Sequence, residues 1–232
     1  MTGGPAAASP ARLRTRAQIV KDTVTFPLRA LTLFEHDRFG LSSLRTERFD
    51  YVAREVRGEC LDVGCGRHNL FVTEWLGGRG RGIDVYAYDG LTADHLVDSL
   101  ETFPFPDESF ETVTFIANLN HVPRSLRDVE LAEAYRVLRR GGNIVLTMGH
   151  PLAEILVHRL VRFYDRVLGT SIDVDTERGM GEEEEFYLLD AEILERLARA
   201  GFRDVRKRRF GSQWGLNHLF VAWKRDAAQS PR

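Results

Sequence analysis

The 232-residue sequence has only two cysteines, no long apolar run and almost no net charge. Cys60 and Cys65, five positions apart, form neither a disulfide framework nor a four-ligand zinc set. No apolar run reaches the roughly 18 residues of a membrane-spanning helix, and the N-terminus lacks the apolar core of a secretion signal. A formal charge of −2 argues against a protein built mainly to hold nucleic acid. We therefore expect a cytoplasmic protein without a nucleic-acid or membrane partner.

The first part of the chain predicts a tail followed by a helical cap. With 43% apolar residues, the chain can build one packed domain with a modest elaboration. Residues 1–18, rich in Ala, Gly, Pro and Arg, predict a flexible tail. Residues 19–58 have apolar side chains every three or four positions, which predicts two or three helices, with Ser42 or Ser43 capping the second. These apolar side chains include Val20, Val24, Leu28, Leu31, Leu33 and Phe34.

From residue 59 the pattern changes to short apolar runs that alternate with helical spacing. Strands that alternate with helices indicate parallel crossover units, and hence an α/β sheet covered on both faces. We assign this core to residues 59–149 and 186–225. Residues 150–185 interrupt it with an amphipathic helix that begins at Pro151 and an acidic stretch, which predict a lid or an acceptor pocket.

A glycine-rich turn follows the first predicted strand, where parallel sheets bind ligands. Gly64 and Gly66 would let the backbone approach a ligand closely, although structural turns also use such glycines. Asp84 ends the next strand, where nucleotide-binding sheets place a carboxylate on ribose hydroxyls; a helix cap or a solvated turn is the alternative. A dinucleotide fingerprint would have glycine where Asn69 stands, and Asp62 suits a cation better than a pyrophosphate. These details argue against a dinucleotide.

The motif LDVGCG, with GID following it, resembles the first motif of class I S-adenosylmethionine-dependent methyltransferases, Asp/Glu-x-Gly-x-Gly. The resemblance continues in order through HLVDSLETFPFPDESFETVTF and EAYRVLRRGGNIVLTM. It covers residues 59–149 closely and extends over 186–224 as a last helix and strand pair. It implies a small-molecule, type 11-like enzyme, a Rossmann-like seven-stranded, mostly parallel sheet with an antiparallel last strand, and S-adenosyl-L-methionine as the cofactor.

The resemblance also implies a cofactor site. Asp62 would stand near the methionine amino group, with Gly64 and Gly66 under the cofactor, and Asp84 would hold both ribose hydroxyls. The other cofactor positions that it implies are Val85, Asp98, Ser99, Leu100 and Ile116. Two departures stand out: His68 replaces the third glycine of many relatives, and NLNHV replaces LHHV.

The acceptor side is predicted from residues expected at the carboxyl edge of the sheet. Methyl transfer from a sulfonium is an in-line displacement in which positioning contributes up to ~7–11 kcal/mol. An oxygen or nitrogen acceptor can also need a base, which is commonly histidine and worth about 10²–10⁴-fold. His121 and His150 are the candidate bases, with a structural imidazole as the alternative for each. The predicted substrate contacts are Asn120, Trp214, Asn217 and His218. We expect O-methylation of a small molecule.

Other parts of the chain suggest further contacts and two rival functions. Arg45, Arg48 and Tyr51 of the helical cap could reach the cofactor. His68 and NLNHV leave open a methyltransferase fold that binds the cofactor without turnover. The basic N-terminal residues leave open an enzyme acting on RNA; these are Arg12, Arg14, Arg16 and Lys21. We expect Cys60 to be a buried apolar residue, Cys65 to fill a variable turn position, and no metal site.

Overall fold

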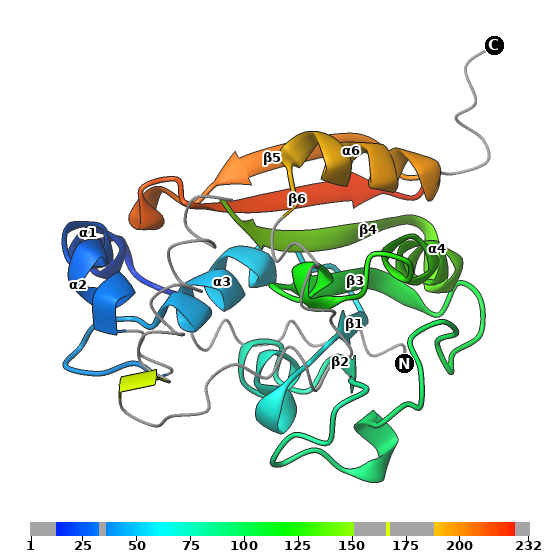
Figure 1. The fold of residues 1–232 in the computed structure, drawn as a ribbon, viewed down its shortest axis with the longest axis horizontal. Coiled ribbons are helices and arrows are strands. Elements are labelled where there is room, and N and C mark those ends of the chain that lie inside the picture. Colours follow the sequence, from blue (N-terminus) through cyan, green and yellow to red (C-terminus); the bar gives the residue numbers. More distant parts are fainter. Residues whose placement is uncertain (1–12, 33–35, 151–165, 168–187, 226–232) are drawn as a thin grey trace, which may run out of the picture.

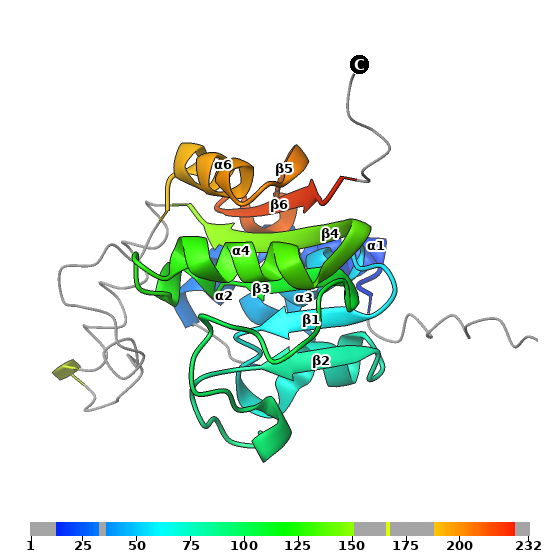
Figure 2. The same cartoon turned by 90° about the vertical axis from the view of Figure 1, so that its right-hand side faces the viewer.

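The computed structural model describes residues 13–32, 36–150, 166–167 and 188–225. The described residues form one six-stranded sheet with helices on both faces (Figures 1 and 2). The strands are β1 (Cys60–Val63), β2 (Gly80–Ile83), β3 (Phe110–Ile116), β4 (Leu138–Gly149), β5 (Arg203–Arg209) and β6 (Asn217–Trp223). The longer helices are α1 (Arg16–Val24), α2 (Phe26–Thr32), α3 (Leu44–Ala53), α4 (Arg127–Val137) and α6 (Asp190–Arg199). The predicted helix from Pro151 and most of the predicted insertion 150–185 lie outside the described residues.

The strand order is β2-β1-β3-β4-β6-β5. Strands β1 to β4 pair in parallel, and β6 is antiparallel to both β4 and β5, so the sheet is mixed, as predicted. The chain leaves β1 for β2 on one side and returns to β3 on the other. In open α/β sheets such a reversal opens a crevice at the carboxyl ends of the two central strands. The fold therefore places a ligand crevice between the ends of β1 and β3.

The expected strand count of seven is not confirmed in the part of the chain that the structure describes. After β2 the chain forms only an isolated parallel bridge between Asp84 and Leu96. Two hydrogen bonds make this bridge, Asp84 N to His95 O at 2.9 Å and Val97 N to Asp84 O at 3.1 Å. The bridge begins at Asp84, one residue beyond the end of β2 at Ile83. A single bridge therefore stands at this edge of the sheet.

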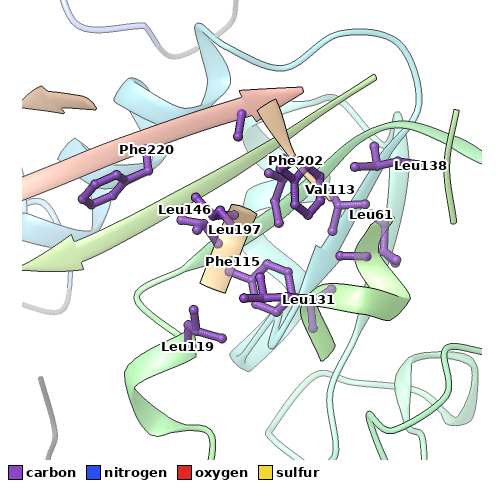
Figure 3. Packing of buried hydrophobic residues seen from close by; sticks show 14 of the residues in the cluster. Leu61, Val113, Phe115, Leu119, Leu131, Leu138, Leu146, Leu197, Phe202 and Phe220 are labelled. Carbon is purple, nitrogen blue, oxygen red and sulfur yellow. The ribbon is translucent and has the colours of Figure 1, made fainter. Parts of the chain in front are cut away.

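Two apolar clusters cover the two faces of the sheet, because successive side chains of a strand point to opposite faces. On one face, β-strand residues such as Leu61 and Phe115 pack with Leu131 of α4 and Leu197 of α6 (Figure 3). On the other face, Cys60 packs with Phe49 of α3. Asp62 follows Cys60 by two positions and shares its face, so this carboxylate lies at the end of an apolar cluster.

The glycine turn is followed by less helix than the sequence predicts. The stretch NLFVTEWL has the apolar spacing that predicts a helix, but a 3₁₀ turn (Arg67–Asn69) and one π turn (Phe71–Trp75) stand there. His68 and Asn69 have φ values of 60° and 47°, which a continuous right-handed helix does not allow. Similarly, α4 ends at Val137, before the paired glycines expected to stop it.

The helical cap is confirmed as helices, with Ser43 capping α3. The Ser43 hydroxyl accepts a hydrogen bond from Thr46 N at 3.0 Å. A flexible tail was expected over residues 1–18, but within this range α1 begins at Arg16 and Arg14 is buried, while residues 1–12 lie outside the described residues. In α1 and α2 apolar side chains such as Val20 and Val24 face outward, with Val24 74% exposed, whereas Phe49 and Val52 of α3 are buried. The apolar period thus indicated the helices, but not which side of them is buried.

The buried side of the cap is an ionic cluster. Arg14 pairs with Asp22, Glu47 and Asp50, and Arg29 pairs with Glu47 at 3.1 Å. All five side chains are buried. A buried charge is tolerated only when it is paired and hydrogen-bonded, and this pairing explains why the polar side faces inward.

Candidate cofactor site

A cavity of about 170 Å³ lies at the carboxyl ends of β1 and β3, where the strand order reverses. Its floor is the glycine turn after β1, one wall is the end of β3 from Ile116 to Asn118, and α3 closes it from the cap. Four residues of the predicted cofactor site meet here: Asp62, Gly64, Gly66 and Ile116. The tertiary structure therefore brings the first motif and the end of β3 into one site.

Both glycines of the turn have positive φ, but a side chain at the two positions would meet different surroundings. Gly64 has φ of +73°, and a Cβ there would lie 2.2 Å from Cγ of Asn118. Gly66 has φ of +62°, and a Cβ there would meet nothing within 4 Å. Backbone N–H groups of Gly64 and Cys65 donate to Ile83 O, which ties the turn to β2. Gly64 thus permits close packing, whereas Gly66 borders open space.

Asp84 is buried and holds the same turn. Its Oδ2 accepts from Gly66 N and its Oδ1 from Tyr86 N, both at 3.0 Å. An ionised carboxylate offers about four acceptor positions, so two remain for a diol. Asp84 is therefore placed beside Gly66 with the capacity that the predicted ribose contact needs.

Asp62 is the buried acid of the cavity. Thr114 lies opposite it on β3 and donates its hydroxyl hydrogen to Oδ1 at 2.6 Å. Burial raises the pKa of the Asp62 carboxyl to about 7, the hydrogen bond from Thr114 lowers it, and the charge of Asp84 raises it. A group with this pKa gains from a cation that binds beside it, because the cation favours the charged form.

Hydrogen-bond donors surround the rest of the cavity. The cavity is lined by Arg45 and Arg48 of α3 and by Arg67 of the turn. The sequence suggested that the first two could reach the cofactor. Asn118 Nδ2 is buried and has no hydrogen-bond partner among the described residues. A buried donor without a partner costs about 1–3 kcal/mol, and a ligand oxygen would remove that cost. One acid beside three arginines and an amide suits a ligand that carries both an ammonium and a carboxylate.

The remaining predicted cofactor residues lie away from this cavity. Asp98 and Ser99 line a second hollow of about 610 Å³, and both are exposed. Leu100 is buried in the cluster under α4 and α6. Val85 is exposed and directly follows Asp84. Since Val97 N bonds Asp84 O at 3.1 Å, the second hollow begins next to the acid that holds the glycine turn.

The two candidate bases follow strands, as predicted, but do not line the cavity. Asn120 and His121 belong to a 3₁₀ turn (Leu119–His121) just beyond the cavity wall, and Asn120 Nδ2 lies 3.1 Å from His121 Nε2. His150 follows β4, and its ring centroid lies 5.8 Å from that of His218. Both histidines therefore stand at the carboxyl edge of the sheet, with His121 adjoining the cavity along the chain.

The other predicted substrate residues have structural contacts. Trp214 Nε1 donates to Thr23 O at 2.9 Å, which fastens α1 to the loop before β6. Asn217 Nδ2 donates to Gln213 Oε1 at 2.5 Å. His218 is buried between Asp190 Oδ1 at 3.0 Å and Gly215 O at 3.2 Å. Burial lowers the pKa of His218, against the hydrogen bond to Asp190. Each of the three side chains thus has a hydrogen bond within the protein, while Trp214 stays 60% exposed and the buried Asn217 Oδ1 has no hydrogen-bond partner among the described residues.

Tyr51 is also placed away from the cavity. Its ring stacks on Phe210 with centroids 4.0 Å apart, and the guanidinium groups of Arg14 and Arg208 lie over it. It therefore joins the cap to the end of β5, while Arg45 and Arg48 of the same helix turn to the cavity.

Sequence reasoning missed Thr114 and Asn118. The register of a parallel pair places Thr114 beside Asp62, so a strand alignment could have found it. Asn118 had no such signal, because its position over Gly64 depends on how the chain turns after β3. Over the described ranges, no group of three or more His, Cys, Asp or Glu side chains could hold a metal ion. Nor does any helix in the portion searched have the length and apolarity to cross a membrane.

The strand order, the glycine turn and the carboxylate after β2 define a Rossmann-like α/β domain with a nucleoside-cofactor crevice. Residues 61–146 match a family model described as a methyltransferase domain. This match supports a class I S-adenosylmethionine-dependent methyltransferase domain over these residues, with S-adenosyl-L-methionine as the cofactor that such a domain implies.

Curated relatives of similar sequence share one name. The ubiquinone/menaquinone biosynthesis C-methyltransferase UbiE of Desulfotalea psychrophila is 35% identical over 144 residues, which are 56% of this chain and 56% of that protein. UbiE of Allorhizobium ampelinum is 30% identical over 133 residues, 53% of this chain and 49% of that protein. The chain thus spans about half the length of the curated relatives that it matches.

Solved structures support the fold. A methyltransferase from Thermotoga maritima, described as a possible histamine N-methyltransferase, superposes with a TM-score of 0.57 at 14% identity, over 89% of this chain and 99% of that one. The [4+2]-cyclase SpnF gives 0.53 at 17% identity, over 94% and 98%. At these identities the similarity shows the fold alone.

Proposed function

We propose that the protein transfers a methyl group from S-adenosyl-L-methionine to a small-molecule acceptor. The observation that carries this proposal is the cavity at the end of β1, which is lined by Asp62, three arginines, Asn118 and the glycine turn. The bound cofactor would supply a methyl group already activated on a sulfonium. The protein then has to bind and orient the cofactor and the acceptor, and to exclude water from the site. Orientation contributes up to ~7–11 kcal/mol.

Each element of the site has a distinct part in holding the cofactor. The Asp62 carboxylate would receive the methionyl ammonium, and the arginines with Asn118 would receive the carboxylate. Gly66 would leave room for the cofactor, and Asp84 would accept from the ribose hydroxyls. Val85, Asp98, Ser99 and Leu100 would form the adenine side, with Leu100 contributing from the core. Ile116 would border the methionyl part.

The acceptor atom is the finer part of the proposal. The relatives named above are C-methyltransferases of quinone biosynthesis, and their similarity supports a carbon acceptor on a small cyclic molecule. An oxygen acceptor is the second candidate, because His121 follows the cavity wall and could accept the hydroxyl proton. His121→Ala would then lower kcat by about 10²-fold or more for an oxygen acceptor, and much less for a carbon acceptor.

Cofactor binding and methyl transfer are tested separately. Calorimetric titration with S-adenosyl-L-methionine should show binding by the wild type, which Asp84→Ala weakens strongly. Incubation with methyl-deuterated cofactor and a panel of quinols and phenols, followed by mass spectrometry, identifies the methylated atom. Absence of binding by the wild type would refute the proposal. Binding without any labelled product would favour a cofactor-binding protein without turnover.

The structure weakens the case for an RNA substrate. Arg14 is buried among three carboxylates, and Lys21 Nζ donates to Gly40 O at 2.7 Å. These two of the four basic N-terminal residues are thus committed to internal contacts, while Arg12 lies outside the described residues. An RNA enzyme would still bind RNA with a steep salt dependence, which a filter-binding titration measures.

A further inference from the structure

Thr114 is a buried hydroxyl that the proposed chemistry does not use directly. It lies on β3, in register with Asp62 on β1, and both side chains are almost fully buried. The 2.6 Å hydrogen bond from Thr114 Oγ1 to Asp62 Oδ1 is much shorter than its other contacts, at 3.5 Å to Leu61 O and 3.9 Å to Cys60 Sγ. The hydroxyl is therefore committed to the carboxylate.

Asp62 needs such a partner because of where it lies. On its own face of β1 it follows Cys60, which packs in the apolar cluster with Phe49 and Phe71. Asp62 also lines the cavity. Among the described residues, Thr114 is the side chain that donates a hydrogen bond to it. Without that bond, a buried carboxylate can rotate and gain a proton, and its cost as an anion rises.

We propose that Thr114 is a positioning residue for cofactor binding, whose hydroxyl holds the Asp62 carboxylate in place and ionised so that Oδ2 can receive the amino group of the cofactor. This inference rests on the proposed function, because it takes the ligand of the cavity to be an S-adenosyl amino acid. Thr114 itself does not touch the ligand; it acts through Asp62. The proposal assigns a role to a β3 residue that lies outside the glycine motif.

A pair of ligands separates this role from general damage. S-adenosylhomocysteine carries the amino-acid end, and 5′-methylthioadenosine lacks it while keeping the nucleoside. Loss of a hydrogen bond to a charged group should weaken S-adenosylhomocysteine binding by Thr114→Val about tenfold or more. Binding of 5′-methylthioadenosine should stay unchanged. Thr114→Ser keeps the hydroxyl and should bind both ligands like the wild type, and Thr114→Ala repeats the test if the valine variant does not fold.

A double-mutant cycle tests whether the effect passes through Asp62. Asp62→Asn alone should weaken S-adenosylhomocysteine binding, and adding Thr114→Val should then change the affinity little, because the carboxylate is already gone. If the two substitutions instead act independently, Thr114 does not act through Asp62, and the proposal is overturned.

The pH dependence of S-adenosylhomocysteine affinity also tests the role of Thr114, because a residue with a purely structural role would not shift it. Ammonium binding needs ionised Asp62, so wild-type affinity for S-adenosylhomocysteine should be full above pH 7 and fall as the pH drops below about 7, where this carboxyl takes up its proton. In Thr114→Val the hydrogen bond that lowers the pKa is lost, so the fall should begin at higher pH. The profile should flatten in Asp62→Asn.

The other ionisable groups near Asp62 do not produce the same pattern. Arg45, Arg48 and Arg67 of the cavity are unchanged in every variant. Burial holds the pKa of the Cys65 thiol well above its usual value. Burial also raises the pKa of Glu130 to about 8, and its charge interaction is with Asp84. Asp84 is unchanged in every variant, so any contribution from it or from Glu130 remains in the Asp62→Asn profile.

The outcomes distinguish failure of this inference from failure of the proposed function. If the wild type binds neither ligand, the proposed function fails. If the wild type binds both and Thr114→Val binds S-adenosylhomocysteine equally well with the same pH profile, only the role of Thr114 is refuted. An equal loss of both ligands in the valine and alanine variants also refutes it, because the amino-acid end would not be singled out.

Discussion

Replacing Gly64 and Gly66 by alanine separates two costs that the glycine turn avoids. Both residues have positive φ, +73° and +62°. An L-residue at such a φ costs roughly 1–3 kcal/mol, and Gly66, with ψ of −168°, lies in a region that is essentially confined to glycine. Only at Gly64 would the new Cβ collide, because Asn118 Cγ lies 2.2 Å from its position. The two variants thus share the backbone strain and differ in the steric conflict.

The magnitude of the difference follows from what Asn118 must do. Forcing a packed side chain out of its place costs typically about 1–3 kcal/mol. Gly64→Ala should therefore destabilise the protein by about 2–6 kcal/mol, and Gly66→Ala by about 1–3 kcal/mol. In a chain of this size 1 kcal/mol lowers Tm by about 2–4 °C, so the difference is readily measured by differential scanning calorimetry.

The losses in ligand affinity should rank the two glycine variants differently from the losses in stability. The Cβ of Gly66→Ala would project into open space that the cofactor is proposed to occupy, so this variant should bind S-adenosylhomocysteine far more weakly while losing little stability. The double variant of Gly64→Ala with Asn118→Ala should regain the steric part of the lost stability and keep the strain part. No recovery of stability in the double variant would refute the steric argument.

Two further predictions concern the cap and the turn. Glu47→Gln removes the carboxylate that pairs with buried Arg14 and Arg29 and should cost about 3–5 kcal/mol by urea unfolding. In contrast, Glu55→Gln at an exposed pair should change stability by under about 0.5 kcal/mol; similar values for the two would contradict the burial argument. His68 has φ of 60°, so His68→Gly should keep or raise Tm. The β-branched variant His68→Val should lower the free energy of unfolding by about 1–2 kcal/mol. The reverse order of stability would show that the side-chain contacts of His68 dominate.

The candidate site was only partly accessible from the sequence. Asp62, Gly64 and Gly66 were found because they stand within five residues of one another, and a sharp turn at the end of a strand has a local pattern. Trp214 and His218 were expected at the substrate because their strands end at the right edge. Their hydrogen bonds to Thr23 and Asp190 join segments far apart in the chain, and no local pattern encodes such a contact.

The cap shows the same limit for the fold. Apolar residues every three or four positions correctly predicted its helices, because that spacing reflects backbone periodicity. The period does not say which face is buried, and here the ion pairs of Arg14 and Arg29 put the polar face inside. Likewise, the seven strands that the resemblance implies did not reveal that, among the described residues, the chain after β2 forms only the single bridge at Asp84.

The sequence by itself determined the alternation of strands and helices, the glycine turn and the acid after β2, because each depends on backbone conformation over a few residues. Only the tertiary structure decided that Thr114 lies beside Asp62, that Asn118 covers Gly64, and that α3 brings arginines to the same cavity. The physical reason is that strand register and helix packing join distant segments. Their stability comes from burial and hydrogen bonding summed over the whole domain, which no short stretch of sequence contains.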